Sequence, residues 1–227
     1  MMMMTKRRLM LSGALILLFL AVSILPVTAI QPSPRLVVAE YSIDGTVKVT
    51  STDGDASGYK LLGFKWYDTA NYWVNPQNKY ALSTTAVTQA LQTSANTWDL
   101  ETSRAVFNYR GTTSRTAGRY DGYNVVSWGS YQRGAIAVTY IWYIGDRIVE
   151  TDTTMNTYYK WSLTGQPGKM DVQNIMTHEF GHWCGLADLY GTGDYSLTMY
   201  GYASTGETYK RTLAQGDVLG LVAVYGL

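Results

Sequence analysis

The sequence predicts an α+β protein, in which three main helices accompany several β-rich stretches. Two observations lead to this fold class. Apolar residues recur at helical spacing in three separated segments, and the stretches between them are rich in β-branched and aromatic residues. The 19 tyrosines of the 227-residue chain also suit half-buried sheets, and no internal repeat is present.

The first 29 residues have the pattern of an export signal. Lys6, Arg7 and Arg8 precede an almost wholly apolar run at 9–25, and Ala29 ends a stretch of short residues suited to a signal peptidase. The apolar run of 17 residues is also close to the shortest that spans a bilayer. We therefore expect a secreted protein, and the alternative is a protein that stays anchored by the uncleaved run and faces outward.

Residues 30–58 are expected to be a short pro-segment or an N-terminal hairpin added to the sheet. Residues 35–42 and 46–51 alternate in polarity around Asp44-Gly45, a dipeptide typical of tight hairpin turns. Residues 52–58 are polar and rich in glycine, which indicates a linker. One main domain over residues 59–227 follows.

The main domain begins with a predicted strand at 61–67. Ser83 or Thr84 then caps a helix that extends to Trp98, with apolar residues at helical spacing. Three further β-rich stretches follow at 105–109, 123–128 and 135–143, and residues 151–161 are mixed.

Two more helices complete the predicted fold. One covers residues 171–184 and begins with an aspartate, which favours the positive end of the helix dipole. The other covers residues 213–225, with Gly226 just beyond its end. The Gly-rich residues 185–209 between them are expected to be irregular.

The only two histidines of the chain, His178 and His182, stand four residues apart in the second predicted helix. Side chains at this spacing project from the same face of a helix, so both rings can bind one metal ion. Glu179 is one residue further round, where its carboxylate would lie beside the ion and close to a water. A catalytic zinc site needs a third protein ligand and one open position.

Asp188 is the expected third ligand. Gly185 can end the helix in the left-handed conformation and reverse the chain, which brings Asp188 back under the ion three residues later. The alternative for Asp188 is a solvated loop acid, in which case Asp171 and Asp194 are the next candidates. Cys184, the only cysteine, is expected to be a small buried residue and not a ligand.

Two motifs resemble those of a known family. Residues 178–188 (His-Glu-Phe-Gly-His-Trp-Cys-Gly-Leu-Ala-Asp) resemble the zinc motif of the metzincin peptidases, and residues 196–200 (Ser-Leu-Thr-Met-Tyr) are similar to their Met-turn. Segments at 121–128, 152–156 and 215–226 are similar to the matrixins in particular. The resemblance covers residues 59–227. It implies a metzincin-like zincin fold, with a twisted mixed β-sheet, three main helices and an irregular C-terminal subdomain.

The resemblance also implies a function, namely a secreted zinc metalloendopeptidase that hydrolyses internal peptide bonds of proteins. Zinc would polarise the scissile carbonyl and acidify a water, and Glu179 would act as the general base. Met199 would pack as an apolar floor under the two histidines. The partners would be protein or peptide substrates of a monomeric enzyme.

Two segments are expected to bind the substrate. By the resemblance, the strand at 135–143 is the sheet edge that pairs with an extended peptide, and residues 201–209 shape the main pocket. The candidate substrate-binding residues are Ala135, Ile136, Ala137, Tyr200, Gly201 and Tyr202.

The chain departs from the matrixin pattern in three respects. Asp188 replaces the third histidine, as in the snapalysin-like branch. No Pro-Arg-Cys-Gly pro-segment is present, which excludes a cysteine switch, and no histidine remains for a second, structural zinc. One catalytic zinc is therefore expected. Structural calcium stays open, but no motif fixes a site for it.

Charge and the identity of residue 179 bear on two other classes of function, nucleic-acid binding and a non-catalytic module. Residues 1–29 carry three basic and no acidic residues, so the remaining chain has 15 basic against 17 acidic residues, a net charge of −2. A nucleic-acid partner is not expected, because the chain lacks the basic excess that phosphates require. A non-catalytic secreted or membrane-anchored zinc-binding or adhesion module on the same fold is the alternative to an enzyme. The presence of Glu179 favours the enzyme.

Overall fold

A computed structural model describes residues 32–43 and 58–227, which belong to one compact unit. They form the expected α+β fold, with one seven-stranded mixed sheet in the order β3-β2-β4-β6-β5-β1-β9. Its strands are β1 (Arg35–Ile43), β2 (Ala70–Asn75), β3 (Phe107–Thr112), β4 (Asn124–Gly129), β5 (Ala135–Ile144), β6 (Arg147–Asn156) and β9 (Tyr202–Ala203). The short strands β7 (Trp161–Ser162) and β8 (Met170–Asp171) pair separately, and a 3-10 turn, η1, spans Tyr209–Arg211.

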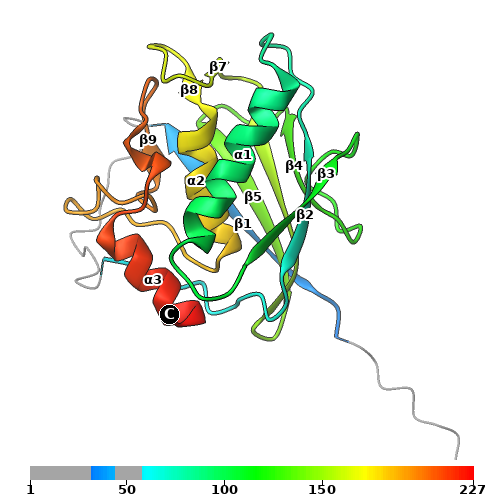
Figure 1. The fold of residues 1–227 in the computed structure, drawn as a ribbon, viewed down its shortest axis with the longest axis vertical. Coiled ribbons are helices and arrows are strands. Elements are labelled where there is room, and N and C mark those ends of the chain that lie inside the picture. The colour runs from blue at the N-terminus through cyan, green and yellow to red at the C-terminus, as the bar shows by residue number, and fades with distance from the viewer. Residues whose placement is uncertain (1–31, 44–57) are drawn as a thin grey trace, which may run out of the picture. The chain divides into compact units, whose positions relative to one another are not determined.

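The strand β5 lies inside the sheet of the full chain. It pairs antiparallel with β6 on one side and antiparallel with β1 on the other, and the last two residues of β1 pair in parallel with β9. Figure 1 shows β1, in blue, running beside β5. The expectation that residues 135–143 form a free sheet edge is therefore wrong for this chain, because β1 occupies that edge.

Two helices lie side by side against one face of the sheet (Figure 1). They are α1 (Thr84–Asp99) and α2 (Val172–Trp183), and both agree with the predicted segments. The hydroxyl of Ser83 caps α1, and Trp98 Nε1 on α1 donates to the carbonyl of Thr177 on α2 at 2.7 Å. This packing buries α2 almost completely, so its side chains reach the sheet and not solvent.

The third predicted helix is α3 (Gln215–Tyr225), which begins two residues later than expected and ends at Gly226. The irregular stretch at 185–209 is confirmed, with only β9 and part of η1 in or beside it. The strand predicted at 61–67 is wrong, because these residues make only isolated bridges to distant residues. The first strand after residue 58 is instead β2, in which alternate residues face the core.

The mixed stretch at 151–161 contains the end of β6, a ten-residue strand. The pattern hid this strand because most of its buried residues are polar, among them Glu150 and Asp152, each 1% exposed. Asp152 accepts three backbone N–H groups from residues 118–125 at 2.6–3.1 Å, and Glu150 accepts two more from the same loop. These charge-assisted bonds hold the loop between β3 and β4 against the sheet.

The buried carboxyl of Asp152 leads to a pH-dependent stability. Burial raises the pKa of Asp152 to about 7, and the neighbouring Glu150 adds to the rise while the three N–H donors oppose it. An acid with a raised folded-state pKa stabilises the fold most below about pH 4, and this contribution is lost as the pH rises towards 7. We expect the free energy of unfolding of wild type to fall relative to that of Asp152→Asn across this window, as measured by urea denaturation. A difference that stays constant with pH would contradict it.

Several predictions at the N-terminus lie outside the described residues, namely the export signal at 1–29, the turn at Asp44-Gly45, the strand at 46–51 and all but the last residue of the linker at 52–58. The first half of the predicted hairpin is observed as β1, paired with β5 and β9. Across residues 32–43 and 58–227, no helix combines the length and the apolar character needed to cross a membrane.

Candidate metal centre

Three ligand atoms converge at the C-terminal half of α2. The Nε2 atoms of His178 and His182 lie 3.1 Å apart, and Asp188 Oδ1 lies 3.1 Å from the first and 3.6 Å from the second. A tetrahedral zinc with bonds of 2.0–2.1 Å holds its ligand atoms about 3.3 Å apart. The three residues are therefore spaced to hold one metal ion, and both histidines are fully buried.

Backbone carbonyls fix the protonation of both imidazoles. His178 Nδ1 lies 2.8 Å from the carbonyl oxygen of Thr198, and His182 Nδ1 lies 2.9 Å from that of Leu186. A carbonyl only accepts, so each Nδ1 carries the proton and each Nε2 presents a lone pair to the centre. Burial also lowers the pKa of His178 to about 4, which keeps the ring neutral at neutral pH. Two lone pairs and a carboxylate then face one another and repel unless a cation lies between them.

The turn after α2 directs Asp188 back to the histidines, as the sequence predicted. Gly185 has a φ of +92°, and the N–H of Leu186 donates to Gly181 O at 3.0 Å, which closes a Schellman motif. A Cβ at position 185 would lie 2.4 Å from the carbonyl oxygen of Phe64. Glycine is therefore required both by the left-handed conformation and by the close approach of a neighbouring backbone.

We expect Gly185→Ala to lower the free energy of unfolding by about 2–4 kcal/mol, because it adds left-handed strain to a steric clash. Chemical denaturation measures this change. Gly193→Ala is the matched control in the same stretch, since a Cβ there meets nothing within 4 Å and its φ is not left-handed. Equal stabilities of the two variants would show that the turn does not depend on Gly185.

The turn at 196–200 packs against α2 beside the candidate metal centre. Asp217 on α3 accepts the N–H groups of Thr198 at 2.8 Å and Met199 at 3.0 Å, and Thr198 in turn presents the carbonyl that orients His178. Met199 is 2% exposed, and a Cβ at Gly181 would lie only 2.2 Å from its sulfur. Met199 thus packs directly on α2 at Gly181, which agrees with the apolar support that the family resemblance implied.

Glu179 is fully buried, and among the described residues only one of its two carboxylate oxygens accepts a hydrogen bond. Its Oε2 accepts a hydrogen bond from Thr139 Oγ1 at 2.5 Å, Thr139 bonds Thr153 at 2.6 Å, and Trp183 Nε1 donates to Thr153 at 2.8 Å. Its Oε1 has no hydrogen-bond partner among the described residues. Burial raises the pKa of Glu179 well above its usual value. No local sequence pattern pointed to Thr139 and Thr153, because only the pairing of β5 with β6 brings them under α2.

The other candidate ligands lie outside the cluster. Asp171 caps the N-terminus of α2 and forms a 2.6 Å ion pair with Arg211. Asp194 accepts the N–H of Gly191 at 2.8 Å, within its own loop. Cys184 is buried and free, as expected for a packing residue.

The predicted substrate-binding residues border the groove that β1 fills. Ala135, Ile136 and Ala137 are buried on β5, where Ala137 pairs with Tyr41 of β1. Gly201 accepts the N–H of Ser42 at 3.2 Å. Tyr200 and Tyr202 flank Gly201, and Tyr202 pairs with Ser42. The structure brings both predicted segments to opposite sides of β1.

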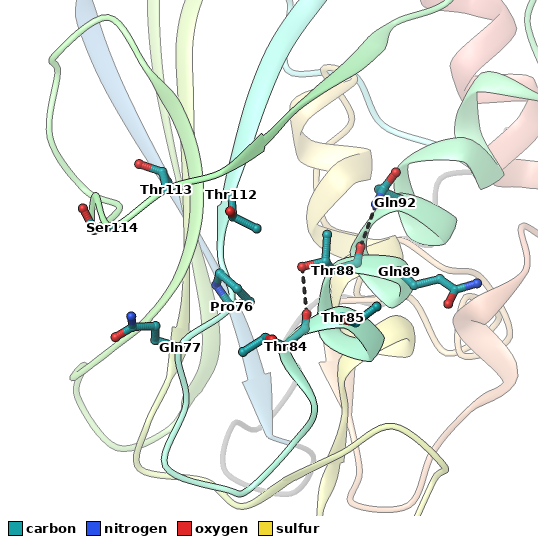
Figure 2. Close-up of a pocket in the computed structure, with 10 residues that line it drawn as sticks. All are labelled: Pro76, Gln77, Thr84, Thr85, Thr88, Gln89, Gln92, Thr112, Thr113 and Ser114. Atoms are coloured by element: carbon teal, nitrogen blue, oxygen red, sulfur yellow. Dashed lines mark hydrogen bonds between the residues drawn. The ribbon is translucent and has the colours of Figure 1, made fainter.

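A separate pocket of about 870 Å³ lies at the N-terminal end of α1 (Figure 2). Its walls are proline, glutamine, threonine and serine side chains, without a titratable group. Figure 2 shows that two of them, Thr88 and Gln92, bond back to carbonyls of their own helix. The pocket contains no residue of the candidate metal centre and no acidic, basic, histidine or cysteine side chain.

Comparison with known proteins leaves the function to be inferred from this geometry. No protein-family model matches the chain, and no curated protein matches it significantly. The inference therefore depends on the three converging ligands and on the buried carboxylate beside them.

Proposed function

We propose that the protein is a secreted, zinc-dependent endopeptidase with a metzincin-like, matrixin-type site. The observation that carries this proposal is the convergence of two deprotonated Nε2 atoms and the Asp188 carboxylate next to Glu179, whose Oε1 lacks a partner among the described residues. The similarity of residues 178–188 and 196–200 to the metzincin motifs supports the same proposed activity. The export signal at 1–29 supports secretion.

The donor set suits zinc. Two neutral imidazoles and one carboxylate are ordinary zinc ligands, and three protein ligands leave one position open for substrate or water. The bound ion would supply a Lewis acid that polarises a carbonyl and lowers the pKa of a water.

Glu179 would act first as the general base and then as the general acid of the hydrolysis. Its Oε1 is free to take a proton from the attacking water and to pass it to the amine of the leaving peptide. Thr139 holds Oε2, so the carboxylate keeps one orientation throughout. The hydrogen bonds from Trp183 through Thr153 to Thr139 fix this geometry within the core.

Once β1 has left it, the groove between β5 and β9 would bind the peptide as an added strand. Backbone groups of both strands face the same groove, and Thr139 of β5 reaches Glu179. Main-chain pairing gives sequence-tolerant affinity, as an endopeptidase requires, and side-chain pockets then select the cleavage position.

Cleavage of casein and of internally quenched peptides by the purified chain tests the proposal. We expect turnover that a zinc chelator abolishes and added zinc restores. Turnover that resists the chelator would contradict a zinc peptidase. Stoichiometric zinc binding without turnover, both in the wild type and in a Tyr41→Ala variant that loosens β1, would favour the non-catalytic zinc-binding module.

A further inference from the structure

The described residues bury most of the centre that the proposed function requires to be open, and the Asp188 side chain keeps only 12% exposure. His178, Glu179 and His182 are all 0% exposed. A peptidase of this kind must admit an extended peptide to the carboxylate and the ligand cluster, so another part of the molecule occupies the place of the substrate.

The segment that covers the centre is β1. It pairs along its length with β5, from Arg35 opposite Tyr143 to Ser42 opposite Ala135. At its C-terminal end, Ser42 N–H donates to Gly201 O at 3.2 Å and Ile43 N–H donates to Gly134 O at 3.0 Å. β1 therefore uses the main-chain groups on both sides of the groove that an added peptide strand would use.

Tyr41 anchors β1 over the metal centre. Its ring stacks on the imidazole of His178, with centroids 3.6 Å apart and planes inclined by 6°. Its hydroxyl accepts a 2.8 Å hydrogen bond from Lys210 Nζ, and that buried ammonium also pairs with Glu207 at 3.1 Å and donates to Tyr202 O at 2.6 Å. The phenol ring thus fills the space beside His178, and a buried cation holds it there.

β1 is attached less firmly than the strands beside it. Tyr41 is its only fully buried residue, whereas β5 and β6 bury most of their side chains. Leu36 and Val38 on β1 remain 49% and 42% exposed. The strand is held mainly by its backbone ladder and the Tyr41 anchor. Glu40 adds hydrogen bonds accepted from Tyr131 Oη at 2.6 Å and Gln132 Nε2 at 3.2 Å, and Val37 and Ile43 pack at the margin of the core. Because all its other side chains lie outside the fully buried core, β1 can leave without dismantling that core.

We propose that β1 is an intramolecular inhibitor, which occupies the substrate groove as a peptide strand and keeps the full chain latent until it is displaced. The proposal rests on the proposed peptidase function. It differs from latency through a cysteine ligand, because the blocking group is the Tyr41 ring together with strand pairing. The measured turnover of the full chain should accordingly be set by the fraction of molecules in which β1 has left the groove.

Two variants of the full chain test the inhibition. Tyr41→Ala removes the anchor, and we expect its kcat/KM for a quenched peptide to exceed that of wild type by about tenfold or more. Tyr195→Ala, at an exposed tyrosine outside the groove, should leave kcat/KM unchanged. Hydrogen exchange provides a readout independent of activity, with faster exchange of residues 35–43 in Tyr41→Ala and unchanged protection of α2.

The second variant, Val38→Cys/Tyr140→Cys, locks β1 in place. The two positions are opposite each other in the antiparallel ladder, where Cα atoms lie about 4.5–5.5 Å apart, within the range of a disulfide. We expect the oxidised form to have less than about a tenth of the turnover of the reduced form. Val38→Cys alone controls for the reductant, since the natural Cys184 is buried.

These results separate the two proposals. Equal turnover of the oxidised and reduced lock would overturn the inhibition while leaving the peptidase function intact. So would a Tyr41→Ala chain in which β1 exchanges rapidly but turnover does not rise. If exchange shows that β1 has left the groove and no form cleaves peptide, the proposed function itself fails, and the inhibition fails with it.

Discussion

Glu179→Gln is expected to abolish peptide hydrolysis while leaving the fold and zinc binding intact. The amide has the same shape as the carboxylate, and its oxygen can still accept the hydrogen bond from Thr139. It cannot take a proton from water, so the proton transfer that limits attack is lost. General acid–base catalysis contributes about 10²–10⁴-fold, and we expect kcat/KM to fall by at least that range.

The measurement compares kcat/KM and zinc content of Glu179→Gln in the Tyr41→Ala background, where the groove is expected to be open. Glu101→Gln, at an exposed glutamate in the turn just after α1, is the matched control and should change neither quantity. A Glu179→Gln chain with undiminished turnover would remove Glu179 from the reaction. A chain without bound zinc would instead give Glu179 a structural role in the metal centre.

Asp188→Ala is expected to lower the affinity for zinc by more than about 100-fold, because loss of a group that only orients a ligand already costs 10–100-fold. The substitution removes the only carboxylate of the three-residue cluster and leaves two imidazoles, which cannot complete a zinc site. Competition with a chromophoric chelator measures the affinity directly.

Asp194→Ala is the matched control for Asp188, because Asp194 lies in the same irregular stretch, is 6% exposed and is outside the cluster. We expect its zinc affinity to equal that of wild type. If Asp194→Ala lost zinc and Asp188→Ala kept it, the assignment of the third ligand would be reversed. Equal affinity in both variants would show that neither carboxylate binds the ion.

The helices and the candidate metal ligands were predictable because their signals are local. Ser83 and Asp171 cap α1 and α2 as the sequence indicates, and a helix needs only its own caps and spacing. The ligands lie within residues 178–188, where the geometry of one helix and one glycine turn determines their approach. A single sequence segment therefore contains most of the information for the centre.

The sheet and the groove were less predictable because they depend on distant pairing. β1 pairs with β5, about a hundred residues later in the chain, and nothing in residues 35–43 specifies that partner. The core face of β6 is largely polar, so the strand lacks the alternation of apolar and polar residues that indicates a half-buried strand. The partners that orient the histidines are the backbone carbonyls of Thr198 and Leu186, and a carbonyl leaves no residue-type signal.

The proposed function requires that His178, His182 and Asp188 together hold one zinc ion beside Glu179. Anomalous diffraction at the zinc absorption edge, from crystals of the full chain grown with one equivalent of zinc, tests it most directly. We expect one anomalous peak per chain, bound by the Nε2 atoms of both histidines and a carboxylate oxygen of Asp188, at about 2.0–2.2 Å. The absence of a peak at these three residues, or a peak bound by the histidines with Asp188 turned away, would contradict it.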